Sequence, residues 1–359
     1  MQETLIQLAC KDKKVSWDGV NVKIMQNKKY RALVVRGTVE TGFSRKVEML
    51  SLADLPQGEL LIRIHYSSLN YKDALSAQGN HGVTRRYPHT PGVDAAGVVE
   101  SSESALFSVG DEVLCMAYDL GMNTAGGFAE YIRVPASWVL AKPVGISLYE
   151  SMQLGTAGFT AAQCVDRLLT SGIKPENGTI LVTGATGGVG SLAVALLKTI
   201  GFTVTGVTGK ENEHDFLQHL GCTTILNRKQ ATGRKSAAML RERWAGVVDT
   251  VGGEILASAI KATCYDGVVT CCGNAASGDL PLTVYPFILR GVSLVGIDSA
   301  CCPMERRKRI WDKLASDWKL HILDELTSCI SLDDLNPAID AMLAGQARGR
   351  VVIDVRKEQ

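Results

Sequence analysis

Glycine recurs at every third position of the segment 183–190, which reads Thr-Gly-Ala-Thr-Gly-Gly-Val-Gly. The segment follows an apolar run at 180–182, typical of a buried strand, and leads into an apolar stretch with helical periodicity. Glycine permits a tight turn, close approach of a phosphate to the backbone, and close packing of the helix on the strand. Free N–H groups at a helix start bind phosphate. The segment therefore predicts a dinucleotide-binding loop, although Ala185 stands where the common fingerprint has its first glycine. The alternative is a tight turn that binds no ligand.

Strand and helix patterns alternate from about Ser147 onward. Six short β-favouring runs lie at 179–183, 203–207, 224–226, 247–250, 268–272 and 293–297. Helical patterns separate most of them, at 191–200, 211–220, 236–244 and 254–263. Six strands with crossover helices are the content of a doubly wound parallel sheet, so we expect an α/β fold.

The chain before this region is β-rich and punctuated by Gly, Pro and Asp. Its β-favouring runs lie at 32–35, 60–64, 96–100, 112–117 and 129–134, which suggests a barrel-like or sandwich-like domain. After the last sheet strand we expect helices at 305–323 and 335–344 and a final strand at 350–355. Such a tail could fold back onto the first domain. We therefore expect an N-terminal extension at 1–29, a discontinuous domain at 30–146 and 300–359, and an inserted domain at 147–299.

The tip of the second sheet strand indicates which dinucleotide binds. An NAD site usually has an acidic residue there, to bond the ribose 2′-hydroxyl. Here the tip reads Thr208, Gly209 and Lys210, and Arg228 follows the next strand. A hydroxyl and cations suit the charge of a 2′-phosphate, so we expect NADPH rather than NADH. The alternative is that Lys210 is an ordinary surface lysine.

Composition excludes several classes of protein. The 38 Lys and Arg against 37 Asp and Glu give a formal charge of +1, which argues against nucleic-acid binding. The sequence contains no run of 18 or more apolar residues, so it predicts no membrane-spanning helix. None of the six histidines or ten cysteines shows a metal-site spacing, so we expect no metal. Ten cysteines are too few for a disulfide scaffold in a chain of this length, which fits a reducing compartment, and we expect the cytoplasm.

Several segments together resemble a known family. They lie at 67–75 (Ser-Ser-Leu-Asn-Tyr-Lys-Asp-Ala-Leu), 91–97 (Pro-Gly-Val-Asp-Ala-Ala-Gly), 126–130, 155–161, 248–252, 286–290 and 296–299. In this order they resemble the medium-chain dehydrogenase/reductase superfamily, within it the zinc-free quinone-oxidoreductase branch, and most narrowly the acrylyl-CoA reductase (NADPH), or YhdH-type, group. Zinc members have a Cys ligand and a Gly-His-Glu motif where this chain reads Asn70-Tyr71 and Gly92-Val93-Asp94.

The resemblance implies a GroES-like domain made of two chain segments, with a Rossmann domain inserted between them and NADPH in the cleft. By position, the cofactor contacts of the family fall on thirteen residues of this chain. They are Tyr71, Thr186, Gly187, Gly188, Val189, Thr208, Gly209, Lys210, Arg228, Asn274, Ile288, Ser299 and Gly345. The resemblance also implies a homodimer, with 286–291 at its edge.

The reaction implied is hydride transfer from NADPH to the β-carbon of an α,β-unsaturated acyl-CoA such as acrylyl-CoA, followed by protonation of the α-carbon. Asn70 and Tyr71 are the candidate catalytic residues, because either side chain can donate a hydrogen bond to the thioester oxygen. Tyr71 could instead only pack beside the nicotinamide. Arg306, Arg307 and Lys308 could meet the phosphates of CoA or form a solvated helix face. Two other functions stay open: a reductase of small quinones or enones, and a low-turnover NADPH-binding protein.

Overall fold

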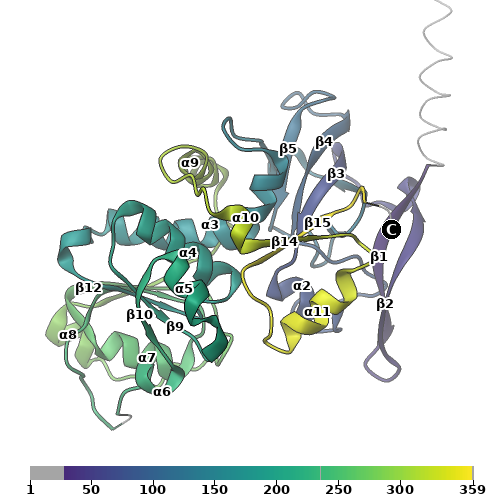
Figure 1. Cartoon of the computed structure of the whole chain (residues 1–359). Coiled ribbons are helices and arrows are strands. Elements are labelled where there is room, and N and C mark those ends of the chain that lie inside the picture. Colours follow the sequence, from purple (N-terminus) through teal and green to yellow (C-terminus); the bar gives the residue numbers. More distant parts are fainter. Residues whose placement is uncertain (1–27, 235, 358–359) are drawn as a thin grey trace, which may run out of the picture.

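The computed structural model describes residues 28–234 and 236–357. The expected extension at 1–29 therefore lies, apart from its last two residues, outside the described residues. Two halves stand side by side, an α/β half in teal and green and a β-rich half in purple and blue (Figure 1). The C-terminal elements, in yellow, lie mostly with the β-rich half. None of the described helices combines the length and apolarity needed to cross a membrane.

The α/β half is built on a six-stranded sheet in the order β10-β9-β8-β11-β12-β13. Every neighbouring pair is parallel. The strands are β8 (Ile180–Thr183), β9 (Val204–Val207), β10 (Cys222–Leu226), β11 (Trp244–Asp249), β12 (Thr263–Cys271) and β13 (Ser293–Gly296). The chain reverses its direction of progress across the sheet after β10, as the expected doubly wound fold requires. That expectation is confirmed.

Helices cover both faces of this sheet, because successive strand residues point to opposite sides. Val182 and Val248 belong to the core under α3, α4 and α5, whereas Leu181 and Val247 belong to the core under α7 and α8. The helices are α3 (Leu148–Thr170), α4 (Gly188–Ile200), α5 (His214–Leu220), α6 (Arg228–Ala231), α7 (Gly253–Lys261) and α8 (Tyr285–Arg290).

The β-rich half contains a two-stranded ribbon, β1-β2, and a seven-stranded sheet in the order β14-β15-β3-β4-β5-β7, with β6 also paired to β3. The strands are β1 (Lys29–Thr38), β2 (Gly42–Ser51), β3 (Leu60–Ser68), β4 (Asp94–Ser102), β5 (Glu112–Met116), β6 (Tyr131–Val134), β7 (Val139–Ala141), β14 (Thr327–Ile330) and β15 (Arg350–Asp354). The helices are α2 (Tyr71–Ala77), α9 (Met304–Leu314), α10 (Leu323–Leu326) and α11 (Leu335–Leu343). Because β15 pairs antiparallel with β3, residues 350–354 lie in the same sheet as residues 60–68.

Two expected helices differ from the structure. The segment 236–244 is not a helix, because the backbone N–H groups of Leu240 and Arg243 donate to carbonyls of Lys261 and Ala262 at the end of α7. The helix expected at 305–323 ends at Leu314. Poor helix formers follow at 316–317, and the chain turns there to bury the apolar side chains beyond them.

Candidate functional site

The glycine loop connects β8 to α4 and requires glycine at two positions. Gly184 has φ of +59°, a left-handed conformation that side chains disfavour. A Cβ at Gly190 would collide with the Gly184 carbonyl. α4 begins at Gly188 with Gly187 as its N-cap, and no side chain of the described residues caps it. The first N–H groups of α4 can therefore bind an anion.

A small cavity of about 90 Å³ opens beside this loop, at the carboxyl ends of β8 and β9. The structure brings together there five of the residues expected to contact the cofactor: Thr186, Thr208, Gly209, Lys210 and Arg228. The Thr186 and Thr208 hydroxyls lie 3.3 Å apart. A Cβ at Gly209 would lie 2.5 Å from Arg228 Nε, so this glycine makes room for the guanidinium.

The two cations of this cavity differ in their partners. Lys210 Nζ donates a hydrogen bond to the Ala347 carbonyl, and burial lowers the pKa of Lys210. The exposed Arg228 guanidinium forms no hydrogen bond or ion pair with any other described side chain or backbone group. Arg228 is therefore the cation that is available to a phosphate.

The segment 345–349, between α11 and β15, lies against the glycine loop. The Gly349 N–H donates to the Thr186 carbonyl at 3.0 Å, and Lys210 reaches Ala347 in the same segment. Gly345 has φ of +70° and ends α11. The C-terminal part of the chain thus forms one wall of the loop region.

Three further expected contacts follow other strands. Asn274 and Ser299 lie in the loops after β12 and β13, at the same edge of the sheet as the glycine loop. Ile288 is 68% exposed on α8. In the same helix, Arg290 donates to the carbonyls of Lys261, at the end of α7, and Thr263, at the start of β12. This end of α8 therefore lies at the opposite edge of the sheet, and Ile288 lies away from the glycine loop.

Asn70 is the N-cap of α2 and Tyr71 is its first residue. Their side chains differ in whether their hydrogen-bond donors are already engaged. The Tyr71 side chain is 49% exposed, and within the described part of the chain its phenol has no hydrogen bond. Asn70 Nδ2 lies 2.7 Å from an Asp94 oxygen, 3.2 Å from the Ser68 carbonyl and 3.3 Å from an Asp73 oxygen. The two donor hydrogens of Asn70 are therefore already committed, whereas the Tyr71 hydroxyl is free.

Asn70 belongs to a group of buried and partly buried polar side chains that the sequence did not reveal. We call it the buried polar cluster and define it as Ser68, Asn70, Asp73, Asp94, Thr156 and Arg350. Arg350 Nη2 donates to Ser68 Oγ at 2.8 Å, and its Nε donates to the Gln153 carbonyl at 3.0 Å. Asp94 accepts from Ser68 Oγ at 2.5 Å and from Thr156 Oγ1 at 2.6 Å.

Burial and charge shift the ionisation of this cluster. Burial, reinforced by the nearby Asp94, raises the pKa of Asp73 to about 7. Burial also lowers the pKa of Arg350, against the attraction of the two aspartates. Burial disfavours the charged forms of Asp73 and Arg350, and the attraction between the Arg350 guanidinium and the two aspartates favours the charged form of Arg350. The cation is therefore needed where an unpaired buried carboxylate would be costly.

A break in α3 carries one member of the cluster. Gly155 has φ of +52° inside this helix, and a Cβ there would lie 2.5 Å from Ser68 Oγ and 2.6 Å from Asp94 Oδ2. The Thr156 N–H donates to both Asp94 oxygens, at 3.0 and 3.1 Å. Glycine at 155 therefore lets the helix approach β3 and β4 closely enough to complete the cluster.

The residues at this position do not fit a metal ion. Throughout 28–234 and 236–357, no group of three or more His, Cys, Asp or Glu side chains could hold one. The carboxyl groups of the cluster share their space with the Arg350 guanidinium, which already supplies a positive charge. Asn70 and Asp94 of this cluster belong to the two segments, Asn70-Tyr71 and Gly92-Val93-Asp94, at which the sequence resemblance implies no zinc ligand.

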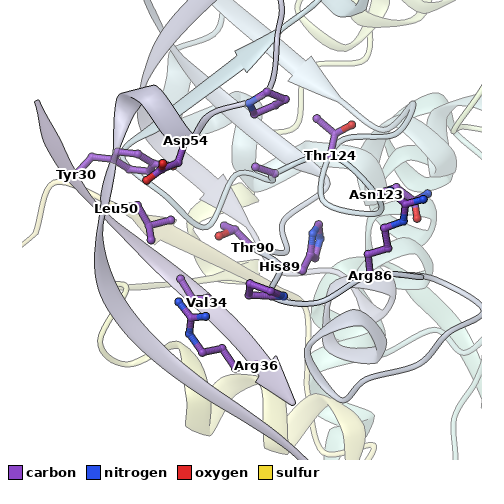
Figure 2. Close-up of a pocket in the computed structure, with 13 residues that line it drawn as sticks. Tyr30, Val34, Arg36, Leu50, Asp54, Arg86, His89, Thr90, Asn123 and Thr124 are labelled. Atoms are coloured by element: carbon purple, nitrogen blue, oxygen red, sulfur yellow. The ribbon is translucent and has the colours of Figure 1, made fainter. Parts of the chain in front are cut away.

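A larger cavity, of about 440 Å³, lies in the β-rich half (Figure 2). Tyr30 and Leu50 form one side, Arg86 and Asn123 the other, and His89 lies between them. Burial raises the pKa of Tyr30 to about 12, so its phenol stays protonated. None of the residues expected to bind the cofactor or to act in catalysis lines this cavity.

Comparison with known proteins agrees with the fold and the loop. Residues 56–144 match the family "Alcohol dehydrogenase GroES-like domain", and residues 188–316 match "Zinc-binding dehydrogenase". Acrylyl-CoA reductase AcuI of Ruegeria pomeroyi is 41% identical over 328 residues, covering 91% of this chain and 99% of that protein.

Two crystal structures superpose closely on this chain. Escherichia coli YhdH with bound NADPH is 40% identical, with a TM-score of 0.88 over 90% of this chain and all of that one. Bacillus subtilis YhfP with NAD bound is 41% identical, with a TM-score of 0.89 over 92% of this chain and all of that one. The chain belongs to the medium-chain dehydrogenase/reductase superfamily, in the group of quinone oxidoreductases and acrylyl-CoA reductases.

Proposed function

We propose that this protein uses NADPH to reduce the carbon–carbon double bond of an α,β-unsaturated acyl-CoA, without a metal. The observation that carries the proposal is the cavity beside the glycine loop, where the unpaired Arg228 lies against Gly209. The choice of an acyl-CoA is supported by the 41% identity to acrylyl-CoA reductase AcuI over nearly the full length of both proteins.

Cofactor choice rests on the charges around that cavity, because the two similar structures hold different dinucleotides, NADPH in one and NAD in the other. No acidic residue lines the cavity, whereas Lys210 and Arg228 do. The planar guanidinium of Arg228 can pair with a phosphate through two hydrogen bonds. The remaining expected contacts at the loop, Gly187, Gly188 and Val189, would bind the pyrophosphate through N–H groups.

When bound, NADPH supplies the hydride that reduces the β-carbon of the substrate. Negative charge then develops on the thioester oxygen as it becomes an enolate oxygen, until the α-carbon takes a proton. The Tyr71 hydroxyl is free to donate a hydrogen bond to that oxygen. Asn70 acts as a positioning residue, because its amide ties the start of α2 to Asp94.

Steady-state oxidation of NADPH tests the proposal. The assay compares acrylyl-CoA with a free enone, a quinone, and no acceptor. We expect kcat/KM to be highest for the acyl-CoA ester. A higher kcat/KM for the quinone or enone would show that the substrate is not an acyl-CoA ester. Absence of turnover with every acceptor would favour a protein that only binds NADPH.

We further propose that the protein works as a homodimer in the cytoplasm, with the domain boundaries expected from the sequence. Exposed apolar side chains gather on and before α8, at Val284, Tyr285, Ile288 and Leu289. They lie near the edge strand β13, whose free side could pair with a second copy. Light scattering of wild type and Leu289→Asp tests the dimer, since the variant should be a monomer.

The proposal of the cytoplasm is supported by the described cysteines, which are free thiols and so fit a reducing compartment.

A further inference from the structure

A second charged cavity lies between α3 and α9, apart from the cavity beside the glycine loop. Its volume is about 240 Å³. Its lining residues come from α3, α9 and the segment after β13, and they are Gln163, Asp166, Arg167, Thr170, Ile297, Arg306 and Arg309. Three guanidinium groups and one carboxylate therefore face the same space.

The carboxylate is already neutralised, and two of the guanidinium groups are not. Asp166 accepts from Arg309 Nη2 at 2.8 Å and from Lys313 Nζ at 2.7 Å, one bond to each oxygen. Over the described residues, the guanidinium groups of Arg167 and Arg306 make no hydrogen bond or ion pair. The nearby Asp298 is engaged by the N–H groups of Ala300 and Cys301. The cavity therefore has an excess of positive charge.

Gln163 also lines this cavity, and one polar atom of its side chain is unpaired within the described chain. Its side chain is only 6% exposed, yet its Nε2 has no hydrogen-bond partner among the described atoms. Buried polar groups in folded proteins are normally hydrogen-bonded, so an unpaired one requires an explanation. A ligand with acceptor oxygens would pair with both unpaired arginines in a cavity that Gln163 also lines.

These donors match a phosphate group, whose oxygens accept bidentate hydrogen bonds from arginine. We propose that the α3–α9 cavity binds a phosphate of the CoA moiety, which rests on the acyl-CoA substrate of the proposed function. In a CoA thioester the nucleotide lies at the far end of the pantetheine arm, so it must bind away from the reacting carbons. Ile297 of the cavity lies two positions before Ser299, one of the expected cofactor contacts.

The neighbouring cations of α9 have other roles. Arg307 is buried, donates to carbonyls of Met116, Ser299 and Ala300, and therefore joins α9 to the end of β5 and to the segment after β13. Lys308 is exposed and paired with Asp312 at 2.7 Å. Neither residue lines the cavity, so Lys308→Gln is a matched control for Arg306→Gln.

Binding of 3′,5′-ADP, the nucleotide part of CoA, tests the site without turnover. Calorimetry is performed with the enzyme saturated with NADPH, so that the cofactor site is filled. A hydrogen bond to a charged group contributes enough that Arg306→Gln should weaken binding about tenfold or more. Arg167→Gln should act in the same direction, and Lys308→Gln should change the Kd less than twofold. Equal binding by wild type and Arg306→Gln, or no binding by wild type, would overturn the proposal.

Kinetics separates this site from the proposed reaction. In Arg306→Gln the KM for acrylyl-CoA should rise about tenfold, whereas the KM for acrylyl-pantetheine, which lacks the nucleotide, should not change. If inorganic phosphate binds through Arg306 and 3′,5′-ADP does not, the CoA assignment is wrong. If 3′,5′-ADP binds through Arg306 but acrylyl-CoA is not reduced, the site stands and the reductase proposal fails.

Discussion

Two charged regions flank the glycine loop, and they differ in how completely their charges are paired. Arg350, in the buried polar cluster, is 2% exposed, and each of its three guanidinium nitrogens donates a hydrogen bond. Arg228, in the cavity on the other side of the loop, is exposed and has no protein partner among the described residues. Paired, buried charge joins elements of the chain, whereas unpaired charge beside a cavity is available to a ligand.

This contrast assigns the buried polar cluster a structural role. The cluster connects β3, β4, the break in α3, and β15, with Arg350 close to Gly188 at the start of α4. A cation that is part of the chain thus occupies the junction of the two halves. The following predictions test the two roles, in order of decreasing expected effect.

Removing Arg350 should have the largest effect. Arg350→Met removes the hydrogen bonds of a buried guanidinium and leaves Asp73 and Asp94 buried without the nearby cation that attracts them. Removing one partner of such a buried charged group costs up to about 3–5 kcal/mol. Denaturant unfolding at constant pH measures this loss. Arg348→Met removes an exposed cation two positions away, whose ion pair with Glu213 spans 3.4 Å, and should cost less than about 1 kcal/mol. Equal losses of unfolding free energy in the two variants would show that Arg350 stabilises the fold no more than a surface cation does.

Tyr71→Phe tests the free hydroxyl at the edge of the cluster. Loss of one donor to a developing oxyanion typically lowers turnover about 10²-fold. We expect kcat with acrylyl-CoA to fall by that order, while the Kd for NADPH stays near that of wild type. Tyr265→Phe, which alters another exposed tyrosine, is the control. An unchanged kcat in Tyr71→Phe would show that Tyr71 only packs beside the nicotinamide. The donor would then be a backbone N–H, because the Asn70 amide is already engaged by Asp94 and the Ser68 carbonyl.

Arg228→Gln tests the unpaired cation on the other side of the loop. A charge-assisted hydrogen bond to the 2′-phosphate is lost, so the Kd for NADPH should rise about tenfold or more. The Kd for NADH, which lacks this phosphate, should not change. Fluorescence titration with both cofactors gives the comparison, and Lys229→Gln controls for the loss of one surface charge. A similar change in Lys229→Gln would assign the effect to general electrostatics.

Lys210→Ala should have a smaller effect in the same direction. Its ammonium lines the cavity but already donates to the Ala347 carbonyl, so we expect NADPH binding to weaken by about threefold to tenfold, within the range of one hydrogen bond. NADH binding should be nearly unchanged. Equal losses for both cofactors would mean that Lys210 holds the segment 345–349 and does not recognise the phosphate.

Chelation should have no effect. Because Arg350 supplies the positive charge of the cluster, activity after exhaustive treatment with a chelator should equal that of the untreated enzyme. Elemental analysis before treatment completes the experiment. Stoichiometric zinc whose removal abolishes activity would contradict the structural role of the cluster.

Local patterns in the sequence were sufficient to predict the parallel sheet and its loop. Alternation of strands and helices, the glycine spacing at 183–190, and the absence of an acid at 208–210 each depend on residues close together in the chain. For the same reason the cavity beside the loop could be anticipated, since Thr186, Thr208 and Arg228 follow adjacent parallel strands. Where a segment depended on distant partners, as at 236–244, the local helical pattern was misleading.

Only the tertiary structure decided which charges are paired. Arg350 and its partner Ser68 are 282 positions apart, and nothing in the local sequence of either predicts their hydrogen bond. Side-chain ionisation, burial and hydrogen bonding are set by what other elements bring to the same place. Sequence therefore determined which residues could bind a dinucleotide, and the fold determined that Arg228 is free to do so. The fold also determined that Arg350 and the catalytic candidate Asn70 are engaged by other groups of the chain.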